Sequence, residues 1–132
     1  MDLKAVCTQI CRRFRLRAQE VHSGRNREVF LFRGYVVKVP RNWDGVADND
    51  WEGSVSNATC YPQSDWQVQY ARTRLVYRQD VPILFMERVL PVSRDEIVGL
   101  LGREPAWVGR VDGGQVGFNK QGRLLAYDYG IR

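Results

Sequence analysis

The chain has 132 residues, 44% of them hydrophobic and 27% charged, so we expect one folded domain with a buried core and not a disordered polypeptide. No apolar run approaches the roughly 18–20 residues that cross a bilayer, and the N-terminal basic cluster follows its short apolar stretch, the reverse of a secretory signal. We therefore expect a cytoplasmic protein without membrane spans, and its formal net charge of +5 favours anionic partners.

Cysteine and histidine are too few for a structural zinc site. The three cysteines, Cys7, Cys11 and Cys60, are an odd number without disulfide-scaffold spacing, and His22 is the one histidine. Cys7 and Cys11 lie one helical turn apart, and we interpret them as small buried hydrophobic residues.

Residues 2–17 predict an amphipathic helix, with Asp2 as a cap or first-turn acid. Its apolar positions at helical spacing are Leu3, Val6, Cys7, Ile10, Cys11 and Phe14. Its end carries a basic cluster of Arg12, Arg13, Arg15 and Arg17. This cluster is a candidate contact for nucleic acid, phosphate or an acidic protein, and the alternative is the solvated face of a helix.

Residues 18–40 predict antiparallel strands. The runs 28–32 and 35–39 are rich in β-branched and aromatic residues and are joined at Arg33-Gly34, while 18–22 is a weaker strand. Pro40 ends the hairpin because it cannot donate to a ladder.

The middle of the chain is acidic and then apolar. Residues 42–66 hold five Asp or Glu and no Lys or Arg, and 51–58 predict a short helix that Gly53 weakens. Residues 72–79 and 81–89 then predict another strand pair, with Asp80 near the turn.

The last third predicts a capped helix and a hairpin. Ser93 suits an N-cap, Glu96 completes a capping box and Gly102 ends the helix. A second short helix over 105–109 precedes a hairpin with strands at 116–118 and 123–127 and a turn at 119–122. The order of helices and strands predicts the α+β class.

Lys38 is the first residue that suggests chemistry. It lies in an apolar strand, on the same face as Val36, where a lysine is costly unless a negative partner reaches it. Glu52 and Asp128 are the candidate partners. The alternative is an edge strand that leaves the lysine in water.

A strand lysine, a helix glutamate and an aspartate before an aromatic residue and glycine form the nucleotide-handling set of protein kinases. The sequence resembles the protein-kinase-like fold in this set and in three longer segments. HSGRNREVFLFRGYVVKVP resembles the Gly-loop and the next two strands, and VPILFMERVLP resembles the fifth strand and the hinge. VDGGQVGFNKQGRLLAYDYG resembles the catalytic loop, its hairpin and the metal-binding triplet, so the resemblance spans roughly residues 18–130.

The resemblance implies a curled antiparallel sheet of about five strands with packed helices, like the nucleotide-binding lobe of a kinase followed by the catalytic-loop hairpin. It implies one kinase-like domain over 1–132, in which a basic helix (1–17) precedes a small-lobe-like part (18–90) and remnant helices with the hairpin (91–132). The cofactor-binding residues that it implies are Gly24, Lys38, Glu52, Met86 and Glu87. It further implies Asp128 and Gln115 as metal ligands, Asp112 as the base, and ATP and Mg²⁺ as cofactors that bind weakly or not at all.

The sequence departs from the family at the positions that matter for catalysis. The Gly-loop keeps one glycine, beside the bulky Arg25 and Arg27, and Asp112 stands three residues before Gln115 where the family has five. Gln115 replaces an asparagine, which moves a ligand oxygen by about 1.5 Å from a metal that is strict about geometry. The activation segment and the helices of the larger lobe are not in the sequence, which ends at Arg132.

We therefore favour a kinase-like protein that lacks phosphotransfer activity and binds another macromolecule, expected to be a protein, to regulate or inhibit it. A small basic protein of this kind would suit a phage or mobile-element origin. Two alternatives stay open: an active minimal phosphotransferase that uses ATP and Mg²⁺, and a nucleic-acid-binding module that uses the basic helix.

Overall fold

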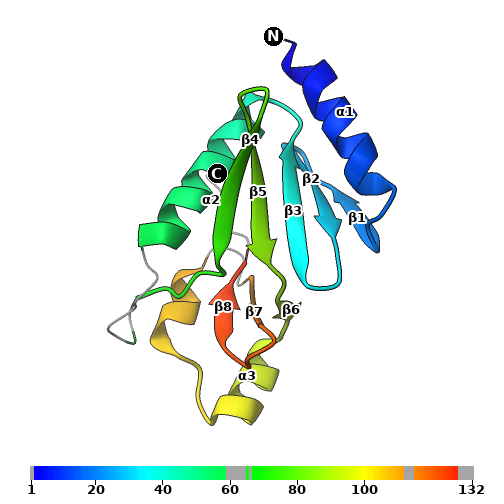
Figure 1. Cartoon of the computed structure of the whole chain (residues 1–132). Coiled ribbons are helices and arrows are strands. Elements are labelled where there is room, and N and C mark those ends of the chain that lie inside the picture. The colour runs from blue at the N-terminus through cyan, green and yellow to red at the C-terminus, as the bar shows by residue number, and fades with distance from the viewer. Residues whose placement is uncertain (1, 59–64, 66, 112–114, 128–132) are drawn as a thin grey trace.

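The computed structural model describes residues 2–58, 65, 67–111 and 115–127 (Figure 1). Its elements in chain order are α1 (Leu3–Arg15), β1 (Glu20–Ser23), β2 (Arg27–Leu31), β3 (Tyr35–Pro40), α2 (Trp43–Ala58), β4 (Thr73–Arg78), β5 (Val81–Glu87), β6 (Leu90–Pro91), α3 (Arg94–Leu101), the 3-10 helix η1 (Ala106–Arg110), β7 (Val116–Phe118) and β8 (Leu124–Ala126). Strands β1 to β5 form one sheet, and β6 to β8 form a second, smaller one. Within the described ranges, we find no helix long and apolar enough to span a bilayer.

Helix α1 lies along one face of the larger sheet with its apolar side inward. Asp2 caps it, since its Oδ1 accepts a hydrogen bond from the Ala5 amide at 3.3 Å. The side chains that α1 buries in the core are Leu3, Val6, Cys7 and Cys11. Burial, together with a hydrogen bond to Glu28, raises the pKa of the Cys11 thiol to about 12, so this thiol stays protonated at neutral pH.

The larger sheet confirms the predicted class and strand pairing. Its order is β1-β2-β3-β5-β4, every neighbouring pair is antiparallel, and the sheet stays open. Because successive side chains alternate, Val37 and Val39 of β3 join the core under α1, whereas Lys38 points to the α2 side. Helices α1 and α2 thus cover opposite faces of the sheet (Figure 1).

Helix α2 starts eight residues earlier than the sequence predicts. The predicted start at residue 51 is wrong, because glycine lowers helix propensity but here permits close packing. A Cβ at Gly45 would collide with the backbone carbonyl oxygen of Asn26, and one at Gly53 would lie 2.7 Å from a Leu75 methyl group. Tertiary contacts therefore favour these glycines inside the helix.

The smaller sheet contains the predicted hairpin, β7 and β8, and a strand that the sequence did not predict. This strand, β6, pairs with β7 where a Cβ at Gly117 would collide with the Leu90 carbonyl oxygen. The predicted capping box of α3 is confirmed: Ser93 and Glu96 bond reciprocally and Gly102 ends the helix with φ of 80°. The sheet is tied to the chain before β4, since the Ala71 amide donates to the Ala126 carbonyl at 2.9 Å.

Candidate functional site

A cluster of buried polar side chains lies between the larger sheet and α2. We call it the inner network, and its members are Arg27 from β2, Lys38 from β3, and Asn49 and Glu52 from α2. Glu52 is fully buried and lies between the two cations. The Arg27 guanidinium donates two hydrogen bonds to the Glu52 carboxylate, at 2.5 and 3.1 Å. The Lys38 ammonium lies 3.3 Å from each oxygen of the same carboxylate.

The Lys38–Glu52 pair that the sequence suggests is thus present, and the exposed-lysine alternative is wrong. Lys38 is only 4% exposed. Its ammonium also donates to the backbone carbonyl of Tyr127 at 2.9 Å, and the Tyr127 amide donates to the Gln115 carbonyl. The lysine therefore links the larger sheet, α2 and the end of the smaller sheet.

Asn49 completes the network by satisfying backbone as well as side-chain groups. Its Oδ1 accepts from Arg27 at 3.1 Å, and its Nδ2 donates to the carbonyl oxygens of Lys38 and Pro82 at 3.0 and 2.9 Å. Buried charges are tolerated when their hydrogen bonds are satisfied in this way. The network consequently holds β3, β5 and α2 in one geometry.

The turn that carries Gly24 is tied down at the start of α2. The Gly24 amide donates to the Arg27 carbonyl at 2.8 Å, and the Gly24 carbonyl accepts from the Arg41 guanidinium at 2.8 Å. The Asn26 carbonyl accepts from the Arg41 amide, and the Asn42 side chain contacts Asn26 Oδ1 at 3.3 Å. The Gly24 amide, expected to face phosphate, is used to close the turn.

Met86 and Glu87, which the resemblance implies as cofactor-binding residues, are engaged in packing and in the sheet. Met86 is buried in a core cluster. The Glu87 amide donates to the Arg72 carbonyl, and its carboxylate accepts from the Arg72 amide at 2.6 Å and from the Asn119 side chain at 2.9 Å. Glu87 thus ties the larger sheet to the turn of the smaller one.

The predicted metal ligands and base are only partly described. Asp112 and Asp128 lie outside the described residues, so their predicted roles stay predictions. Gln115 Oε1 is buried without a hydrogen-bond partner in the part of the chain that the structure describes, which is compatible with a ligand. Among those same residues, we find no group of three or more His, Cys, Asp or Glu side chains that would hold a metal.

The basic cluster of α1 does not form one surface. Arg15 pairs with Glu28 of β2 at 2.9 Å, whereas Arg13 and Arg17 line a groove beside α1. Arg12 is exposed. The four arginines therefore have three different surroundings, which weakens the expectation of a single nucleic-acid-binding stripe.

Three members of this region were not anticipated from the sequence as partners of Lys38 and Glu52. Arg27 was detectable, because hairpin pairing places it on the same strand face as Val29, which lies opposite Lys38. Asn49 was detectable once Glu52 was placed on a helix, since it lies one turn before it. The Tyr127 contact had no local signal, because it joins backbone to a side chain 89 positions away.

Comparison with solved structures finds a distant likeness to WbdD. A crystal structure of WbdD at 2.2 Å resolution has a TM-score of 0.43 and 13% identity, and a co-crystal structure of WbdD with the kinase inhibitor LY294002 has 0.40 and 14%. Each match covers 86% of this chain but 32% of the WbdD chain, so this chain spans about a third of WbdD. No protein-family model matches the sequence, and no curated protein matches it.

Proposed function

We propose that this chain is a kinase-like domain that does not transfer phosphate and that acts as a regulatory binding protein for another macromolecule. The observation that carries the proposal is the burial of Lys38 and the set of hydrogen bonds that its side chain makes. The residue is 4% exposed, and its ammonium group donates internally to Glu52 and to the Tyr127 carbonyl. A lysine–glutamate pair of this kind is also present in active kinases. What supports the proposal is that the pair is held by further internal bonds, from Lys38 to the Tyr127 carbonyl and from Arg27 to Glu52.

The chemistry of phosphoryl transfer supports the same conclusion. The reaction depends on positioning and on charge stabilisation, with little covalent help from the protein. Here Arg27 shares the Glu52 carboxylate with Lys38, and the Gly24 amide closes its own turn. Displacing reacting groups by about 1 Å lowers rates roughly a hundredfold. Several internal bonds would have to break before these groups reached a phosphate.

One observation favours the alternative, an active minimal phosphotransferase. The buried Gln115 Oε1 lacks a partner among the described residues and is of the type that binds Mg²⁺. If ATP and Mg²⁺ bind, Gln115 would contribute to holding the metal ion, which would neutralise phosphate charge, and Lys38 would turn towards the nucleotide.

Incubation with labelled ATP and Mg²⁺ or Mn²⁺, alone and with cell lysate, tests the proposal. We expect no label transfer, and no thermal stabilisation by ATP with Mg²⁺. A ligand at a hundredfold over its Kd would stabilise the fold by about 2.7 kcal/mol, which a melting curve detects. Label transfer that is lost in Lys38→Met and Asp128→Ala but kept in the matched control Lys120→Met, an exposed lysine, would overturn the proposal.

A further inference from the structure

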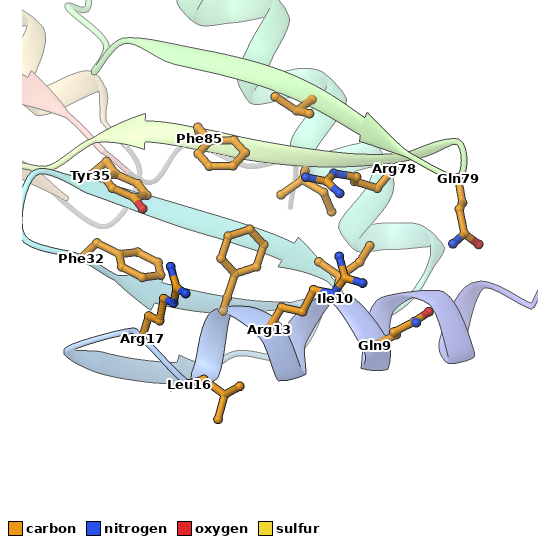
Figure 2. Close-up of a pocket in the computed structure, with 13 residues that line it drawn as sticks. Gln9, Ile10, Arg13, Leu16, Arg17, Phe32, Tyr35, Arg78, Gln79 and Phe85 are labelled. Atoms are coloured by element: carbon orange, nitrogen blue, oxygen red, sulfur yellow. The ribbon is translucent and has the colours of Figure 1, made fainter.

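The face of the larger sheet that carries α1 is only partly covered. Helix α1 contacts β2, β3 and β5, and beside it a groove of about 660 Å³ extends over β5 towards β4 (Figure 2). Strands lie about 4.8 Å apart and a helix is about 10 Å wide, so a five-stranded sheet has room for roughly two helices on one face. A helix bound in the groove would lie beside α1, over β5 and β4.

The floor of the groove is apolar and preorganised. Tyr35 stacks on Phe32 at 4.7 Å and on Phe85 at 6.1 Å, and Phe14 of α1 packs edge-on against Phe85. Val76 of β4 is half-buried beside them. Aromatic rings that already hold one another lose little freedom when a partner binds, which favours affinity.

The walls of the groove carry one sign of charge. On one side, Arg13 extends from α1 and Arg17 from the turn that follows it, and Arg78 comes from the end of β4 (Figure 2). None of the residues that line the groove is an Asp or Glu. Arg74 is exposed and lies opposite Phe85 in the pairing of β4 with β5, so it adds a further cation on the same sheet face.

We propose that this groove binds an acidic amphipathic helix of a partner protein. The apolar side of that helix would cover Tyr35, Phe85 and Val76, and its Asp or Glu side chains would meet the arginines on both walls. This inference rests on the proposed function in one respect: the groove would be the surface by which a regulatory protein binds its partner.

A nucleic-acid strand fits the groove less well. Single strands bind by stacking bases on exposed aromatic faces. The ring of Tyr35 already stacks on Phe32, just after β2, and on Phe85 of β5. The half-buried Val76 side chain would also lie against polar base edges. The combination of arginines with an aliphatic and aromatic floor is better matched by a protein helix.

Selection of a displayed library of random 20-residue peptides on the intact protein tests the inference. We expect enriched peptides with apolar residues at i, i+3 or i+4, and i+7, and with net negative charge. Fluorescence anisotropy should show at least tenfold weaker binding to Arg13→Glu/Arg78→Glu. Binding should be nearly unchanged for Arg12→Glu/Arg33→Glu, which alters the same net charge at exposed positions outside the groove.

Four outcomes would overturn the inference. They are the absence of any enriched peptide, enriched peptides without acidic character, equal binding by both double variants, and a labelled dT20 oligonucleotide that binds the groove more tightly than the peptides. Sedimentation of the protein alone provides a fifth, since self-association lost in Arg13→Glu/Arg78→Glu would assign the groove to a second copy. Phosphotransfer by the protein would overturn the proposed function while leaving peptide binding to be judged separately.

Discussion

The two faces of the larger sheet differ in which side chains they bury: one buries charged groups, and the other leaves an aromatic ring partly exposed. On the α2 face, Lys38 and Glu52 are 4% and 0% exposed although both are ionisable. On the α1 face, the aromatic Tyr35 is 41% exposed. The difference follows from the layer above each face: α2 contacts β3, β4 and β5, whereas α1 leaves the β4 side open.

This contrast shows that residue type alone does not locate a binding surface. The charged set on the α2 face has the composition of a catalytic site, yet its hydrogen bonds close on one another and on the Tyr127 carbonyl. The apolar strand face beside α1 has the composition of a core, yet no element of the described chain completes it. We therefore look for partner binding on the α1 face and for stability on the α2 face.

The largest effect should come from Glu52→Gln, which removes a carboxylate that Arg27 and Lys38 share. Two buried cations would lose their common counter-charge, and breaking such a pair costs about 3–5 kcal/mol. Urea denaturation should show this loss, while Glu20→Gln, at an exposed position, should change the free energy of unfolding by less than about 0.5 kcal/mol. Equal stability of the two variants would mean that the inner network does not stabilise the fold.

A smaller effect should follow from Gly45→Ala, which tests how tightly the Gly24 turn lies on α2. The added methyl group would collide with the Asn26 carbonyl oxygen, and such overpacking costs about 1–3 kcal/mol. The matched change Gly99→Ala, in α3 with open space around it, should be neutral or stabilising by up to about 1 kcal/mol. If Gly45→Ala melts as the Gly99 variant does, the turn is not held as closely as described.

The smallest effect should be at the ion pair on the α1 side of the sheet, Arg15 with Glu28. The Arg15 side chain is 53% exposed, so water screens the pair and it should contribute less than about 1 kcal/mol. A double-mutant cycle of Arg15→Ala and Glu28→Gln measures this coupling. A coupling free energy above about 2 kcal/mol would contradict the view that the α1 face is open to water whereas the α2 face is closed.

Much of the fold could be predicted from local patterns. Alternation in 35–39 placed Lys38 on the strand face opposite Val37 and Val39, and the Ser93–Glu96 capping box fixed the start of α3 within a residue. The first half of α2 was missed because Gly45 is required by a contact with residue 26, which no local propensity records.

The site was harder to predict than the fold. Its first pair, Lys38 and Glu52, could be proposed from residue types and spacing, but whether it is exposed to a ligand depends on what surrounds it. Arg27, which the sequence singled out only as a bulky residue in the Gly-loop, forms an ion pair with Glu52. The groove beside α1 could not be predicted at all, because it results from the difference in coverage between two helices.

The contact between Lys38 and the Tyr127 carbonyl also bears on the order in which the chain folds. Arg27, Lys38 and Glu52 are all synthesised before β4, whereas Tyr127 follows Glu52 by 75 positions. At about 5–20 residues per second, ribosomes make this interval last roughly 4–15 s. Closing so long a loop costs entropy that local hairpins do not. The docking of β8 beside Gln69–Ala71 is therefore a late step, and it brings the Tyr127 carbonyl that accepts from Lys38.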